Sequence, residues 1–162
     1  MKNSKARRVT EAALICALYV ALTWLSNVVG LASGSIQLRL SEALCVLPYF
    51  TSSAIYGVSL GCLISNLTMG ALPLDIVVGT IATLIGAAFT YFIRNKWLCP
   101  IPSVLSNTLL IPVVITVTVS TEWSWGLYFV SLAGVFIGEF ISVYVLGILL
   151  IKALEKRKLF KR

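Results

Sequence analysis

Side chains that can bind a solute interrupt otherwise apolar stretches of this sequence. They are Arg39, Glu42, Asn66, Asp75, Asn107 and Glu139. A carboxylate accepts hydrogen bonds, an amide both donates and accepts them, and a guanidinium donates several in a fixed plane. Such groups are costly inside lipid, where they mark functional sites that face the protein interior. We therefore predict that these residues form a polar binding site within an apolar protein.

Three of these residues also have a purely structural interpretation. Arg39 and Glu42 are three positions apart, so they could form an ion pair with each other on one helix. Asp75 lies in the predicted first turn of a helix, where the helix dipole stabilises an acid. The sequence alone leaves pairing, capping and ligand binding open for these three.

The amides and aromatic residues leave similar alternatives. Asn66 and Asn107 could join helices by hydrogen bonds, and Trp24 and Tyr128 could stack on a planar ligand without any spacing that singles them out. Glu139 is different, because no basic residue is close to it in the sequence. A carboxylate near the bilayer midplane needs a partner, a proton or a ligand, and we therefore interpret Glu139 as functional.

Composition sets the class of protein. Of 162 residues, 59% are hydrophobic and only 12% are charged, against about 25% charged in soluble domains. We expect an all-α integral membrane protein with a single transmembrane domain over residues 1–162. The chain has no histidine and no CxxC pair, which disfavours an enzyme, a metal site and redox chemistry. We also expect no nucleic-acid partner.

Hydropathy divides the chain into six apolar segments. They cover approximately residues 9–29, 36–48, 54–69, 74–93, 101–119 and 125–154. A full span needs about 20 residues, so the second segment is short, and it could join the third as one span kinked at Pro48. Six passes place twelve of the thirteen basic residues on one side, as the positive-inside rule requires. We therefore predict six transmembrane helices, cytoplasmic termini, and basic tails at about 1–8 and 152–162.

This topology assigns a depth to each polar residue. Arg39, Glu42 and Asp75 fall at the outer ends of their helices, and Glu139 falls near the midplane of the last one. We predict a cup that opens to the outside, with Glu139 at its floor.

Small residues mark two helix faces. Ala13, Ala17 and Ala21 recur every four residues, and such spacing lets another helix approach closely. The approaching helix could belong to this chain or to a partner protein. For Gly57 and Gly61, which follow the same spacing, we predict packing within the chain.

Several segments resemble a known family. They are RLSEAL at 39–44, LP at 47–48, GVSLGCLISN at 57–66, DIVVGTIATL at 75–84 and NTLLIP at 107–112. With six short helices, a basic N-terminus and an alanine ladder, the chain resembles a substrate-binding S component of an energy-coupling-factor (ECF) transporter. Within that group it is similar to the QueT family, which is assigned to the uptake of queuosine precursors.

The resemblance implies partners and a location. The face of Ala13, Ala17 and Ala21 would contact the transmembrane coupling protein, which rests on two cytoplasmic ATPases. The chain has no Walker A motif, so that partner subunits would hydrolyse ATP and this chain would need no cofactor. Residues 31–41 would form an outer gating loop, and the protein would lie in the plasma membrane of a prokaryote.

The predicted site suits a deazaguanine base such as queuine. One edge of the base presents two adjacent N–H donors, which a carboxylate such as Glu139 or Glu42 can accept together. Asn66 or Asn107 could read the other edges, and Asp75 could receive an amine on the ligand. The alternatives are an S component for another vitamin-like micronutrient and a stand-alone secondary carrier of a nucleobase-like solute.

Overall fold

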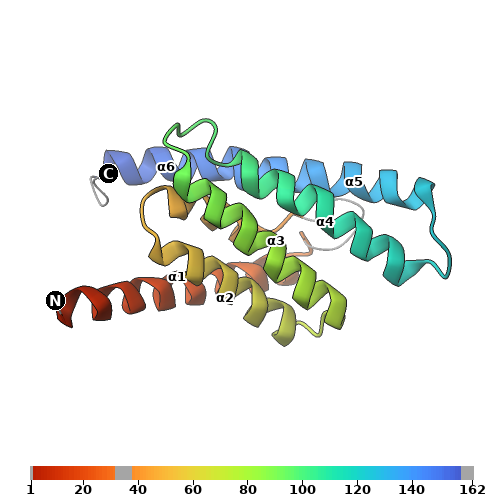
Figure 1. The fold of residues 1–162 in the computed structure, drawn as a ribbon, viewed down its shortest axis with the longest axis horizontal. Coiled ribbons are helices and arrows are strands. Elements are labelled where there is room, and N and C mark those ends of the chain that lie inside the picture. Colours follow the sequence, from red (N-terminus) through yellow and green to blue (C-terminus); the bar gives the residue numbers. More distant parts are fainter. Residues whose placement is uncertain (1, 32–37, 158–162) are drawn as a thin grey trace.

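The computed structural model describes residues 2–31 and 38–157, and its regular elements in these residues are all helices (Figure 1). In chain order the elements are α1 (Lys2–Val28), the 3-10 helix η1 (Leu40–Tyr49), α2 (Ser53–Thr68), α3 (Pro73–Phe92), α4 (Ile101–Val119), α5 (Trp125–Glu139), the π-helix η2 (Phe140–Leu146) and α6 (Gly147–Lys156). The last three elements follow one another without a break and form a single pass. The chain therefore crosses the bundle six times, as predicted.

Successive passes run in alternating directions, and both termini lie at the same end of the bundle (Figure 1). Each α-helix from α1 to α4 contacts the next α-helix along the chain. Within residues 2–31 and 38–157, four helical spans are long and apolar enough to cross a membrane, namely 5–28, 73–92, 101–119 and 125–156. This is the composition of a multi-pass membrane protein.

The second pass is η1, and it is shorter than the predicted segment, of which residues 36 and 37 lie outside the described part of the chain. It has ten residues, but a 3-10 helix rises about 2.0 Å per residue, so that η1 covers about 20 Å. The chain turns back at residues 50–52 before α2 begins. A single span kinked at Pro48 is therefore wrong.

η1 lies at the centre of the bundle, in contact with α1, α2, α3, η2 and α6. Cys45 and Val46 are fully buried, and a Cβ atom added to Gly147 would lie only 2.5 Å from Cγ1 of Val46. Backbone that departs from the α-helix is tolerated at membrane depth only where protein surrounds it. The central position of η1 meets that condition.

Glycines allow close contacts between neighbouring helices. A Cβ atom on Gly57 would lie 2.8 Å from Cβ of Ile15, and one on Gly61 would lie 2.6 Å from Cβ of Tyr19. The prediction that these glycines pack within the chain is confirmed. Gly86 of α3 is equally close to α4, because its added Cβ would lie 2.6 Å from Cα of Ser103.

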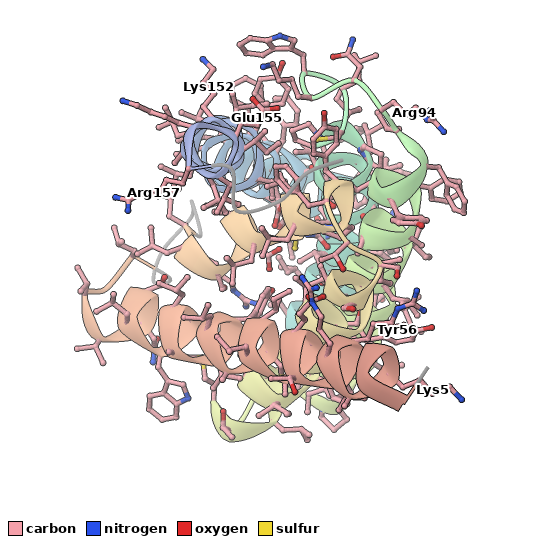
Figure 2. The ribbon with its side chains drawn as sticks, turned by 90° about the vertical axis from the view of Figure 1, so that its left-hand side faces the viewer. Lys5, Tyr56, Arg94, Lys152, Glu155 and Arg157 are labelled. Atoms are coloured by element: carbon pink, nitrogen blue, oxygen red, sulfur yellow. The ribbon has the colours of Figure 1, made fainter. Side chains whose placement is uncertain are left out.

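Basic residues gather at the end of the bundle that holds the termini. Figure 2 views this end and shows Lys5, Arg94, Lys152 and Arg157 around it. Lys96 pairs with Glu155 at 3.1 Å, which joins the α3–α4 loop to α6. The six-pass prediction requires this grouping, and the cytoplasmic location of this end stays a prediction. Residues 158–162 and most of the predicted gating loop (32–37) lie outside the described residues.

Candidate functional site

A cavity of about 140 Å³ lies inside the bundle. Its lining comes from η1, α2, α3, α4 and α5, together with Arg39 just before η1 and Ala71 in the α2–α3 turn. The polar and ionisable residues of the lining are Arg39, Glu42, Cys62, Asn66, Asp75, Thr83, Asn107 and Glu139. The structure thus brings together all the polar residues that the sequence placed within apolar stretches, although they are spread over a hundred positions.

The helix register gives the depth of each side chain in the cavity. On α3, Asp75, Gly79 and Thr83 follow one another at four-residue intervals, and all three line the cavity. An added Cβ on Gly79 would lie 3.9 Å from Ile111 of α4, so that Thr83 is level with Asn107, one turn further in. Asp75 therefore lies toward the α2–α3 turn, at the end opposite the termini (Figure 1), and Asn107 lies deeper.

Glu42 is held by donors from the protein itself. Its Oε1 accepts a hydrogen bond from the hydroxyl of Tyr19, and its Oε2 accepts one from Sγ of Cys45 at 3.2 Å. The hydroxyls of Thr23 and Ser41 share a hydrogen bond at 2.7 Å, which adds a second link between α1 and η1. Both carboxylate oxygens of Glu42 are therefore occupied, and the side chain is 4% exposed.

Arg39 does not form the ion pair that its spacing from Glu42 allowed. The ion pairs in the described part of the chain join Arg7 to Glu11 and Lys96 to Glu155. Nη1 of Arg39 instead donates to Oδ1 of Asn66 at 3.3 Å, across from α2. Arg39 precedes η1 with extended backbone, so that the side-chain geometry of a helical i, i+3 pair does not apply.

Glu139 and Asp75 are less fully bonded than Glu42. Asn107 and Glu139 line the same part of the cavity, and Oε2 of Glu139 is buried without a hydrogen-bond partner among the described residues. Asp75 has no hydrogen bond or ion pair to any residue of that part of the chain. An unpaired buried carboxylate oxygen such as Oε2 of Glu139 is costly unless a donor arrives. Asp75 is only half-buried, and both acids are therefore open to a ligand.

Two aromatic residues that the sequence suggested as stacking partners of a ligand lie outside the cavity. Trp24 is 44% exposed on α1, and its Nε1 donates to Thr68 at 3.3 Å. Tyr128 packs with Trp123, Trp125 and Phe129, at ring-centroid distances of 5.5–6.2 Å from Tyr128. Neither residue lines the cavity. Exposed aromatic clusters at a helix end are typical of membrane–water interfaces.

Sequence reasoning missed the contribution of α1 and of two cavity-lining residues. Tyr19 supports the site by holding Glu42, and its side chain is 1% exposed. Cys62 and Thr83 line the cavity directly. The phenol of Tyr19 was an available signal, because a tyrosine in an apolar helix needs a hydrogen-bond partner when it is buried.

A second concave surface runs along the outside of α1 and α2. This α1–α2 groove has a volume of about 1,050 Å³, and Ala13, Ala17 and Ala21 line it together with Tyr56 and Leu60. All three alanines are exposed, so no helix of the described chain covers them. The groove presents an apolar surface on which a helix of another protein can pack.

No three His, Cys, Asp or Glu side chains within 2–31 and 38–157 are arranged to hold a metal ion. The four cysteines are free thiols, and Cys45, Cys62 and Cys99 are buried. The chemistry available in the cavity is therefore hydrogen bonding and charge pairing.

Comparison with known proteins identifies the family. The family model described as QueT transporter matches residues 9–156. A relative in Lactococcus lactis subsp. cremoris (strain MG1363), named Queuosine precursor transporter QueT, is 36% identical over 85 residues, which is 52% of this chain and 50% of the relative. The alignment thus spans about half the length of that relative. No solved structure matches the chain. Because the family match extends from α1 to the end of α6, the chain belongs to the QueT transporter family.

Proposed function

We propose that this chain is the substrate-binding component of an ECF-type importer and that it captures a queuosine precursor, queuine or a related deazaguanine base, from outside the cell. The observation that carries this proposal is the polar cavity inside an apolar bundle. Three carboxylates, two amides and one guanidinium converge on it. A transporter that had no polar ligand would gain nothing from these costly groups.

The donors and acceptors of the cavity complement such a base. A carboxylate accepts two adjacent N–H groups as a bidentate pair, and Glu139 has an oxygen without a partner in the described chain. Asn107, beside it, can donate to a carbonyl and accept from a ring N–H. A site of this kind rejects analogues that lack the matching groups, because its own buried polar atoms are then left unpaired.

The α1–α2 groove supports the proposal that the chain assembles with the other subunits of an importer. Its exposed alanines offer a surface for close helix packing, where a membrane-embedded coupling protein would dock. The sequence has no Walker A motif, and two partner ATPases would therefore supply ATP hydrolysis. The basic end of the bundle would face the cytoplasm of a prokaryotic cell, in keeping with the positive-inside rule.

The direct test is ligand binding to the purified full chain in detergent. Queuine, its aminomethyl and cyano precursors, guanine, riboflavin and folate are titrated separately by calorimetry. We expect binding of one or more deazaguanines and none of riboflavin or folate. Tight binding of an unrelated vitamin instead would make the chain a binding component for another micronutrient, and binding of none would remove the proposed class of ligand.

A stand-alone secondary carrier is the second candidate, because the buried Glu139 could carry a proton. Proteoliposomes that contain only this chain separate the two functions. Uptake of the base driven by an imposed proton gradient, with no other protein present, would favour the carrier. Uptake only after the coupling protein and ATPases are added would favour the importer component.

A further inference from the structure

The three acids of the cavity differ in what they are bonded to, and this difference suggests the charge of the ligand. Both oxygens of Glu42 are occupied by Tyr19 and Cys45. Glu139 has one buried oxygen without a partner in the described chain, and Asp75 has no hydrogen bond or ion pair there. Two carboxylates are therefore available to a solute, and Glu42 is fixed as part of the cavity wall.

The cavity also carries an excess of negative charge. Its lining contains three carboxylates and one guanidinium. The guanidinium of Arg39 is bonded to the neutral amide of Asn66 rather than to an acid. When Glu42, Asp75 and Arg39 are ionised, the carboxylates outnumber the guanidinium whether or not Glu139 carries a proton, so the empty cavity is anionic. A neutral solute would leave this excess negative charge without a cationic partner.

The two free carboxylates lie at different depths. Asp75 and Thr83 are separated by eight residues of α3, which corresponds to about 12 Å of helix rise. Thr83 is level with Asn107, as the position of Gly79 opposite Ile111 indicates, and Asn107 and Glu139 both line the cavity at its deeper part. The cavity thus presents one acceptor toward the α2–α3 turn and one deeper in the bundle, on the same lining.

We propose that the cavity selects a cationic, amine-bearing form of the base, with Glu139 accepting the N–H edge of the ring and Asp75 accepting the ammonium group. This inference rests on the proposed function, because it specifies the ligand of the same site. The ammonium would form a charge-assisted hydrogen bond with Asp75, and it would offset the negative charge of the cavity. A neutral base of the same shape would bind only through its ring.

The test compares two ligands that share the deazaguanine ring, one with an aminomethyl group and one with a nitrile. Both are titrated into the purified full chain by calorimetry, and into D75N, E139Q and the control E122Q. Glu122 is exposed in the loop before α5 and lines no part of the cavity. We expect the unchanged chain and E122Q to prefer the amine at least about tenfold, which is the value of one charge-assisted hydrogen bond.

D75N should lose most of that preference by weakening the amine alone, and E139Q should weaken both ligands. Equal affinity of the unchanged chain for the two ligands, or an equal loss of both in D75N, would overturn the inference and leave the proposed function intact. The comparison in the unchanged chain does not depend on the folding of any variant. If neither base binds, the proposed function fails together with the inference.

Discussion

Replacing each cavity glutamate by glutamine should separate ligand binding from support of the fold. The two substitutions, E139Q and E42Q, are chemically identical and nearly equal in volume. Their surroundings differ, because Glu42 accepts hydrogen bonds at both oxygens and Glu139 has one oxygen without a partner in the described chain. The same change should therefore act mainly on ligand affinity at one position and mainly on stability at the other.

In the proposed complex, the N–H donors of the base favour the ionised form of the Glu139 carboxylate, and E139Q removes this charged acceptor. Hydrogen bonds to a charged group contribute about 1.5–3 kcal/mol, so the affinity should fall roughly 10- to 100-fold. The free protein should be as stable as before or more stable, since a buried charge with incomplete pairing is replaced by a neutral amide. Calorimetry with the bound deazaguanine measures the first quantity, and thermal unfolding in detergent without ligand measures the second.

E42Q turns one acceptor into an NH₂ donor that faces either the Tyr19 hydroxyl or the Cys45 thiol. A buried donor without an acceptor costs about 1–3 kcal/mol, so the unfolding temperature should fall. Ligand affinity should change by no more than about threefold, which is less than 1 kcal/mol. Unchanged affinity in E139Q, or a larger loss of stability in E139Q than in E42Q, would refute the division of roles.

The remaining predictions concern the outer groove and the α1–α2 contact. Ala17→Leu should fill the α1–α2 groove and weaken assembly with the coupling protein in a pull-down, with ligand binding unchanged. Ala133→Leu, at another exposed alanine, is the control. If the Ala17 and Ala133 variants assemble equally well, Ala13, Ala17 and Ala21 have no role in docking. Gly61→Ala should destabilise the fold by about 1–3 kcal/mol through overpacking, because the new Cβ would lie 2.6 Å from Tyr19. Gly126→Ala, whose Cβ would meet only Ser124 at 3.9 Å, should unfold like the unchanged protein; similar thermal unfolding of the two variants would contradict close packing.

The six charged and amide residues that the sequence proposed for a binding site line the cavity, whereas Trp24 and Tyr128 do not; that any of them binds a ligand stays a prediction. Burying charges and amides within membrane-spanning segments costs free energy, so such residues mark functional sites. The positions of the basic clusters indicate how many passes the chain makes. Counting residues along each pass then places Asp75 near the mouth and Glu139 deeper. The structure has the same order of depth on α3 and α4.

The partners of these side chains could not be predicted in the same way. The choice of Arg39 between Glu42 and Asn66 depends on the rotation of η1 and α2 about their axes, which hydropathy does not determine. The extended backbone at Arg39 also removes the helical spacing on which the ion-pair interpretation depended. Tyr19 was missed for a related reason, since its partner is twenty-three residues away in the sequence.

Both cavity glutamates lie where the chain departs from the α-helix. Glu42 is in the first turn of the 3-10 helix η1, and Glu139 is the last residue before the π-helix η2. η1 and η2 contact each other, so the two irregular segments support one another within the protein, where their backbone groups are shielded from lipid. A π-helical turn changes the direction in which the following side chains point, and such turns occur frequently at functional sites. Regular helices over both segments would rotate Glu139 relative to α6 and Glu42 relative to the turn at residues 50–52. The departures from α-helix therefore allow the chain to keep small-residue packing at Gly147 and Val46 while it directs two carboxylates into one cavity.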